Sequence, residues 1–305
     1  MEDLVSIIIT INNDEKTLKD CIYSVISQTY RNIELIIIDD GSTDDSAKIC
    51  NDLLISNSKL KLFKQLQSGL STSRNKGLEL ASGKYVTFIN GSDIMSNKLI
   101  ENLVSMMNNY EVDIASCKTT YSPNLDNNES SQVITFDTED CLRQLLIGKT
   151  LTNTPYGKLF KKSLFNTIKF QDNEADTIYR LFEESNKTAF LNVNGYYQAE
   201  FEDFSLPTIL NKDLRIIKKY PDLSIYCKYN IVKSIQYEFY YSLTNNLPII
   251  DEDKLYSMFK KIVLENENDI IPFFDYKKKA HLYILANDLN NYKIVCPVLP
   301  EIDKN

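Results

Sequence analysis

The chain has 305 residues and a formal net charge of −8, from 34 basic and 42 acidic side chains. Nucleic acid is excluded as the main partner, because the neutralisation of phosphates requires a basic face. A small anionic ligand stays compatible with this charge, since a local site can be positive within a negative protein. The length and a hydrophobic content of 43% allow one large domain with an appendage, or two domains.

The start of the chain, Met1-Glu2-Asp3, is acidic and lacks the basic and apolar regions of a signal peptide. No uninterrupted apolar run reaches the length that spans a membrane. Six scattered cysteines, none in Cys-x-x-Cys spacing, indicate buried reduced thiols rather than disulfides or a zinc site. We therefore expect a cytoplasmic protein that needs no disulfide and is at most peripheral to a membrane.

Strand and helix patterns alternate through the N-terminal part of the chain. The expected elements are a buried strand over Leu4–Thr10, a helix from Leu18 to about Gln28, a strand over Ile33–Ile38, a helix from about Ser42 through Leu54, and a strand over Lys59–Phe63. This β-α-β-α-β order predicts an α/β fold with a doubly wound, mostly parallel sheet.

The stretch Gln67–Asp93 continues this alternation and ends in a polar loop. A glycine turn at Ser68-Gly69 precedes a helix that begins near Ser71, and Tyr85–Ile89 is rich in residues that favour strands. The loop Asn90-Gly91-Ser92-Asp93 then follows at the carboxyl end of the strand. In open α/β sheets ligands bind at that edge, so we expect a site there.

The remaining sequence predicts further α/β elements and then a change of pattern. The expected elements are a helix over Lys98–Asn109, a strand over Val112–Lys118, a loop over Ser122–Ser131, a helix within Phe136–Ile147 and a late strand over Ala189–Tyr197. Apolar residues at helical spacing then appear over Ile225–Leu243, Leu255–Leu264 and Ala280–Leu289. We predict one domain over residues 1–212 and a small helical C-terminal region over residues 213–305.

Three motifs together carry a family resemblance: Ser6–Thr10, Ile36–Asp44 and Gln67–Asp93. In this order they resemble the family 2 glycosyltransferases of the GT-A fold, over about residues 3–200. The resemblance implies an inverting enzyme that transfers a sugar from a UDP-sugar to a glycan, teichoic-acid or protein acceptor. The alternative is a degenerate member of the family that no longer catalyses and acts as a binding or assembly partner. A nucleotidyltransferase lacks support, because no Gly-rich, Lys/Arg-containing phosphate loop lies near the N-terminus.

Four residues are candidates for binding the nucleotide. Thr10 and Asp40 each close a predicted strand, and the resemblance implies that Asp40 accepts a hydrogen bond from the base, uracil. It also implies that Arg74 lies near the base or the phosphates and that Asn90 belongs to the nucleotide site. The alternative is that Asp40, with Asp39, caps the following turn and that Arg74 is solvated.

The metal-binding loop departs from the family pattern. Relatives carry Asp-x-Asp-Asp, and the four positions here are Asn90, Gly91, Ser92 and Asp93. Ser92 occupies the usual ligand position, and Asn90 offers only an amide oxygen. Because Mg²⁺ and Mn²⁺ favour carboxylates, we expect weakened binding of either ion, with Asp93 as a ligand or merely as a cap for the helix that follows. The charge would then have to come from Arg74 or a lysine such as Lys158.

The general base is altered as well. The family's Glu-Asp pair falls on Asn173 and Glu174, so Glu174 is the candidate base and Asp176 the second choice. An acidic helix N-terminus without any chemistry is the alternative. Glu200, Glu202 and Asp203 stand where relatives carry basic residues.

Two features of the C-terminal region have alternative interpretations. The aromatic-rich segment Tyr226–Tyr241 is a sugar-stacking surface or, as we favour, a packing face or an oligomer contact. His281, the only histidine, is expected to be an ordinary, partly buried residue. No Trp occurs, so the QxxRW motif of processive polysaccharide synthases is missing.

Overall fold

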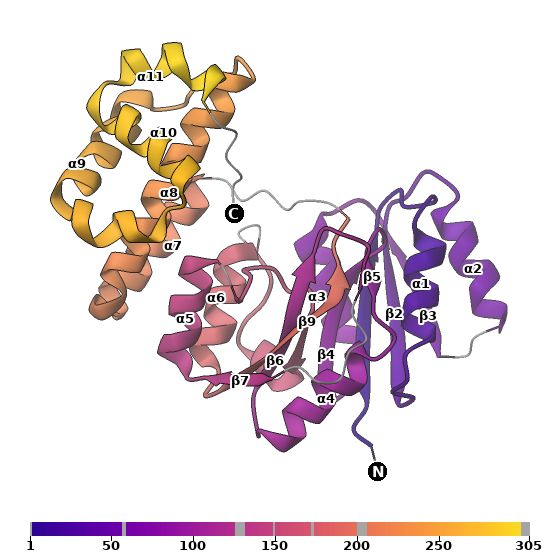
Figure 1. The fold of residues 1–305 in the computed structure, drawn as a ribbon. Coiled ribbons are helices and arrows are strands. Elements are labelled where there is room, and N and C mark those ends of the chain that lie inside the picture. The colour runs from indigo at the N-terminus through magenta and orange to yellow at the C-terminus, as the bar shows by residue number, and fades with distance from the viewer. Residues whose placement is uncertain are drawn as a thin grey trace. The chain divides into compact units, whose positions relative to one another are not determined.

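The structure is a computed structural model that describes residues 2–56, 59–125, 132–148, 150–171, 174–199 and 206–299. The chain forms two compact units (Figure 1). The first unit comprises Met1–Leu142 with Thr150–Asp203, and the second comprises Arg143–Lys149 with Phe204–Asn305. The predicted division at residue 212 falls within helix α7 (Leu206–Lys219), and that division stays a prediction.

The first unit is built on one mixed β-sheet. Its strands follow the order β3-β2-β1-β4-β8-β6-β9-β5, and β7 pairs with β9. The bounds of these strands are β1 (Val5–Ile11), β2 (Ile33–Asp40), β3 (Leu60–Gln65), β4 (Tyr85–Asn90), β5 (Ile94–Met95), β6 (Ile114–Thr120), β7 (Val133–Phe136), β8 (Lys158–Lys161) and β9 (Thr188–Tyr197).

Strands β3, β2, β1 and β4 form the parallel half of the sheet. All residues of β1 and β2 are buried, which explains their continuous apolar sequences. Thr10 is paired with Ile38 of β2 and with Asn90 of β4, so these three strands end together at one edge. The predicted mostly parallel α/β sheet is confirmed; β8 departs from it by pairing antiparallel with β4 and β6.

Helices connect and cover the strands of this sheet. They are α1 (Leu18–Ile26), α2 (Ser46–Ser56), α3 (Leu70–Leu80), α4 (Leu99–Asn109), α5 (Thr138–Ile147), the short 3-10 helix η1 (Lys162–Asn166) and α6 (Glu174–Glu184). Helix α3 lies close against β1, because a Cβ atom at Gly77 would lie only 2.3 Å from the Cγ2 atom of Ile8. The glycine at this helix position therefore has a packing reason.

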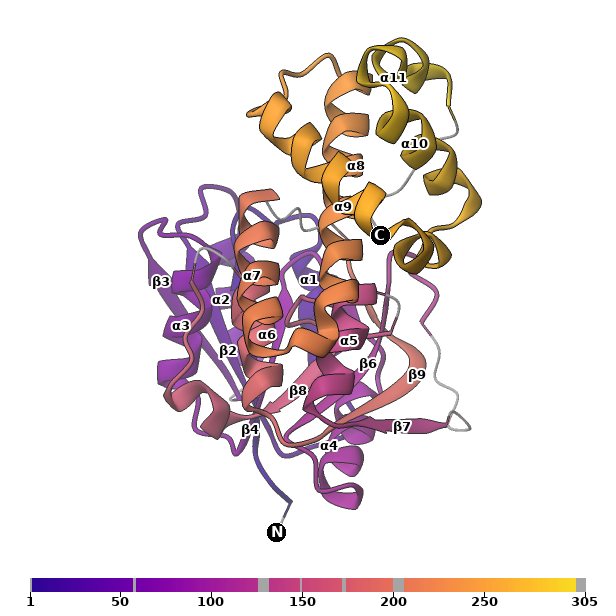
Figure 2. The ribbon, with the colours of Figure 1, turned by 90° about the vertical axis from the view of Figure 1, so that its left-hand side faces the viewer.

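The described part of the second unit is helical, as expected. Its helices are α7 (Leu206–Lys219), α8 (Ser224–Thr244), α9 (Glu252–Ile270), α10 (Tyr276–Asn287), α11 (Leu289–Val295) and the short 3-10 helices η2 (Pro221–Leu223), η3 (Ile271–Phe273) and η4 (Cys296–Val298). Helices α7 and α8 pack side by side (Figure 2). The helix expected over Ala280–Leu289 is α10, which ends at Asn287, because Asp288 is extended and its carboxylate caps α11.

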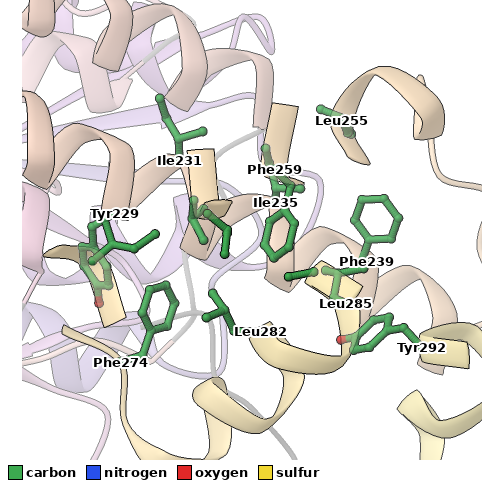
Figure 3. Packing of buried hydrophobic residues seen from close by; sticks show 14 of the residues in the cluster. Tyr229, Ile231, Ile235, Phe239, Leu255, Phe259, Phe274, Leu282, Leu285 and Tyr292 are labelled. Carbon is green, nitrogen blue, oxygen red and sulfur yellow. The ribbon is translucent and has the colours of Figure 1, made fainter. Parts of the chain in front are cut away.

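The second unit has its own hydrophobic core (Figure 3). Phe239 of α8, Phe259 of α9 and Leu282 of α10 are fully buried in it. Tyr229 is also buried there, so the aromatic segment of α8 is in large part a packing face, the interpretation that we favoured. His281 is fully buried rather than partly buried, and its Nδ1 atom lies 2.8 Å from the Tyr292 hydroxyl.

Two expectations from composition can be checked over the described residues. All six cysteines are free and buried, so their expected burial is confirmed. Within the described ranges, no helix combines the length and the apolar character needed to cross a membrane.

Candidate functional site

A pocket of about 300 Å³ lies where β1, β2 and β4 end. We call it the edge pocket. Its lining consists of Thr10, Ile11, Asn12, Asp14, Asp40, Gln67, Gly69, Leu70, Ser73, Asn90 and Ser92. Three of the four predicted nucleotide residues, Thr10, Asp40 and Asn90, therefore share one pocket. The pocket has a size at the lower end of the range for small-molecule sites.

The carboxylate of Asp40 is held by the loop that precedes α3. Its Oδ1 atom accepts hydrogen bonds from the Gln65 side chain at 2.8 Å and from the Ser68 backbone and hydroxyl at 2.9 and 3.0 Å, and Oδ2 accepts from the Gly69 backbone at 2.9 Å. Burial alone would raise the pKa of Asp40, but these hydrogen bonds outweigh burial and lower it. Asp40 is therefore ionised at neutral pH and faces the pocket as an acceptor.

The turn after β2 is capped by the neighbouring acid, not by Asp40. Asp39 accepts a hydrogen bond from the Ser42 backbone at 2.9 Å. Asn12 donates from its side chain to the Asp40 carbonyl at 2.7 Å, which joins the loop after β1 to the end of β2. Asp39 therefore caps the turn, whereas the Asp40 carboxylate accepts hydrogen bonds from the loop before α3.

The start of the loop after β4 is fixed against the end of β1. The Thr10 hydroxyl donates to the Asn90 side-chain oxygen at 3.1 Å, and the Thr10 carbonyl accepts from the Gly91 backbone at 3.0 Å. The Cys21 thiol donates to the Asn90 carbonyl at 3.2 Å. These contacts hold Asn90 at the edge pocket, which Ser92 lines as well.

Asp93 is fully buried and does not belong to the pocket lining. Its Oδ2 atom accepts from the Tyr196 hydroxyl at 2.6 Å, and Oδ1 accepts from the Ala199 backbone at 2.9 Å. Burial and the adjacent Asp93 charge raise the pKa of Tyr196, which keeps that hydroxyl protonated as the donor. Asp93 also does not cap α4, which begins at Leu99 without a side-chain cap. Through these hydrogen bonds to Tyr196 and Ala199, Asp93 fixes the end of β9.

Arg74 and Lys158, the two candidate cations, are fully buried and lie outside the pocket lining. Arg74 donates to the Tyr156 hydroxyl, and its guanidinium lies over that ring at 5.1 Å from the centroid. Lys158 donates to the Thr152 hydroxyl and the Thr154 carbonyl, each at 2.8 Å. Arg74 is not a solvated helix residue, and its predicted contact with the donor stays a prediction.

The segment Phe170–Gln171, which precedes α6 and its candidate bases, is tied to α3. The Ser71 hydroxyl donates to the Gln171 carbonyl at 2.7 Å, and Asn75 exchanges two hydrogen bonds with the Phe170 backbone. Because α3 begins at the pocket wall, this contact joins the segment before α6 to the helix that lines the edge pocket. Asp176 lies half-buried on α6.

Several predicted positions lie outside the described residues. They are Asn173, the side chain of Glu174, and the acids Glu200, Glu202 and Asp203. Over the described part of the chain, no group of three or more His, Cys, Asp or Glu residues could hold a metal ion. A site formed by such a cluster of protein ligands is therefore not present there.

Asp14 is a pocket residue that sequence reasoning missed, together with Asn12 and Gln67. The available signal was their place directly after a parallel strand, since ligands bind at that edge of the sheet.

Comparison of the sequence with models of protein families identifies the family of this chain. The model of glycosyl transferase family 2 matches residues 6–169, which include the whole edge pocket. The chain belongs to glycosyl transferase family 2. It is 30% identical over 216 residues to the glycosyltransferase GlyG of Streptococcus pneumoniae serotype 4, covering 64% of this chain and 70% of GlyG.

Solved structures agree with the GT-A-like fold of this family 2 member. Residues 1–349 of S. aureus TarS in complex with UDP-GlcNAc match with a TM-score of 0.66 and 15% identity, over 96% of this chain and 90% of TarS. The mannosyltransferase PcManGT of Pyrobaculum calidifontis, in complex with GDP-Man and Mn²⁺, matches with a TM-score of 0.55 and 12% identity, over 98% and 87%. At these identities the likeness concerns the fold alone.

Proposed function

We propose that this chain transfers a sugar from a UDP-sugar to a glycan, teichoic-acid or protein acceptor, with inversion at the anomeric carbon. The observation that supports this best is the edge pocket, where Thr10, Asp40 and Asn90 meet at the carboxyl ends of three parallel strands. The match to TarS, a protein that binds UDP-GlcNAc, supports the same class of donor.

The ionised state of Asp40 favours uracil among the pyrimidines. The Oδ2 atom accepts one hydrogen bond from Gly69, and a carboxylate oxygen has two acceptor positions. The imide N–H of uracil is a donor that would fill the second position. Cytosine has a ring acceptor at the equivalent atom, which would face the Asp40 carboxylate unfavourably.

The transfer itself is a single displacement. Glu174 or Asp176 removes the proton from the acceptor hydroxyl, and that oxygen attacks the anomeric carbon. The bond from the anomeric carbon to the β-phosphate oxygen breaks, and UDP leaves on the opposite face. The hydrogen bonds between α3 and the segment Phe170–Gln171, which precedes α6, support this assignment, because α3 begins at the wall of the edge pocket.

The decisive experiment measures UDP release from UDP-sugars in the presence of bacterial surface glycans as acceptors. Glu174→Gln and Asp176→Asn are compared with wild type, and the base variant should lose about 10²–10⁴-fold in turnover while it still binds UDP. Glu79→Gln, an exposed acid on α3, controls for the loss of one charge. UDP binding by wild type without turnover on any donor and acceptor would instead support the degenerate binding protein.

A further inference from the structure

Asp14 is a firmly positioned carboxylate in the loop after β1. Its backbone N–H donates to the Ser46 hydroxyl at 2.9 Å, and its carbonyl accepts from the Leu18 backbone at 2.9 Å at the start of α1. Its Oδ2 atom accepts from the Asn12 backbone at 2.9 Å. The Asp14 side chain is thus fixed at the wall of the edge pocket.

This carboxylate lies against the middle of the loop that departs from the family pattern. A Cβ atom at Gly91 would lie 2.6 Å from Asp14 Oδ2, a distance at which one of the two would have to move. The φ angle of Gly91 is outside the left-handed region, so its backbone does not require glycine. The close approach of Asp14 requires it instead. The neighbours on either side, Asn90 and Ser92, line the same pocket.

The charge of the described pocket lining also points to a cation. The lining contains two carboxylates, Asp14 and Asp40, and no Lys, Arg or His. Asp40 accepts hydrogen bonds from the loop before α3, and Asp14 lines the same pocket as Asn90 and Ser92. A diphosphate that entered this pocket would add further negative charge, which favours the binding of a cation with it.

We propose that Asp14 supplies the protein carboxylate for a divalent cation that binds in the edge pocket together with the donor diphosphate. This inference rests on the proposed function. Mg²⁺ and similar divalent ions are typically held by one or two carboxylates, substrate phosphates and waters. The Asp14 carboxylate with the oxygens of Asn90 and Ser92 is therefore a suitable set of protein ligands. With one carboxylate, the protein alone binds the ion weakly, and UDP and the ion bind cooperatively.

The test is a calorimetric titration of UDP into the full chain, with and without Mn²⁺. Wild type should bind UDP more tightly with Mn²⁺. Asp14→Asn keeps an oxygen that can accept from the Asn12 backbone, and it should bind metal-free UDP like wild type. Its gain from Mn²⁺ should be at least about tenfold smaller, since even partners behind the metal ligands typically change metal affinity 10–100-fold.

Two further variants make the result specific. Gly91→Ala keeps every charge but displaces the Asp14 carboxylate, and it should also reduce the gain from Mn²⁺. Asp45→Asn removes an exposed carboxylate outside the pocket and should behave like wild type. Thermal melts confirm that each variant is folded.

The outcomes separate this inference from the proposed function. An equal gain from Mn²⁺ in wild type and Asp14→Asn overturns the role of Asp14. Metal-free UDP binding that Mn²⁺ does not strengthen in wild type overturns the cation itself. A failure of wild type to bind UDP under either condition overturns the proposed function, and this inference with it.

Discussion

The Asp40 carboxylate both stabilises the loop before α3 and lines the edge pocket. It accepts three hydrogen bonds from the backbone and hydroxyl groups of Ser68 and Gly69, and it lines the edge pocket. Any ligand contact made by Asp40 therefore depends on the loop before α3 being closed. We expect substitutions in this loop to weaken UDP binding even where they touch no ligand atom.

Carboxylates placed in the loop after β4 should strengthen metal binding. In the double variant Asn90→Asp, Ser92→Asp, position 90 can still accept from the Thr10 hydroxyl, and two carboxylates join Asp14 at the pocket. We expect a higher Mn²⁺ affinity in the presence of UDP, measured by calorimetry, because Mn²⁺ favours carboxylate ligands. An unchanged Mn²⁺ affinity in a folded variant would contradict our interpretation of this loop.

The site residues differ in how well the sequence alone predicts their positions. Thr10, Asp40 and Asn90 could be located because each ends a strand, and the register of parallel strands brings such ends together. The position of Arg74 could not be predicted in this way, since its burial depends on Tyr156, which lies 82 positions further along the chain. Asp14 was missed because its helix-starting role is local, while its approach to Gly91 is a tertiary contact.

At the scale of elements, Glu34 joins three segments of the sheet. Its Oε1 atom accepts from the Ser6 hydroxyl of β1 and from the Ser82 backbone before β4, each at 2.7 Å. Its Oε2 atom accepts from Lys61 of β3 at 2.9 Å. Burial alone would raise the pKa of Glu34, but these hydrogen bonds lower it to about 2. The ionised carboxylate therefore stabilises the edge of the sheet opposite the pocket.

This pKa predicts a defined loss of stability in acid. A carboxyl whose pKa falls from 4.5 to about 2 on folding contributes on the order of 3 kcal/mol above pH 4.5, because the folded state favours its ionised form. That contribution is lost as the pH falls from about 4.5 to about 2. In urea unfolding, Glu34→Gln should lower the free energy of unfolding at neutral pH and flatten its decline over this range.

Glu79→Gln provides the matched comparison for this measurement, since the Glu79 side chain is 61% exposed. Its effect on the free energy of unfolding should be small at neutral pH, as is usual for exposed ion pairs. Parallel pH profiles for wild type and Glu34→Gln would show that the hydrogen bonds of Glu34 do not act as described.

At the scale of the whole molecule, the α/β unit and the helical unit were predictable to different degrees. The order of strands and helices up to β4 follows from alternating apolar patterns and short turns. The antiparallel insertion of β8 between β4 and β6 could not be predicted from the sequence, because it joins segments that are distant in the sequence. In the helical unit, periodicity predicted helices, but not the break at Asp288, which depends on a local cap.

The acidic character of the chain bears on the central claim that it binds a nucleoside diphosphate. A net charge of −8 and a pocket with two carboxylates oppose non-specific attraction of anions. We therefore expect UDP binding to come from specific contacts such as the one proposed for Asp40. The discrimination between pyrimidine bases reports those contacts without any contribution from the phosphates, which UDP and CDP share.

The most direct test is calorimetric titration of UDP and CDP into wild type, Asp40→Asn and the exposed-residue control Asp20→Asn. Wild type and Asp20→Asn should bind UDP more tightly than CDP. Asp40→Asn should lose about 1–3 kcal/mol of UDP binding, roughly 5- to 150-fold in affinity, because the amide oxygen is taken by Gln65 and Ser68 and an NH2 group replaces Oδ2, the proposed acceptor for uracil. Equal UDP affinity in folded Asp40→Asn and wild type, or equal affinity of wild type for UDP and CDP, would contradict this account.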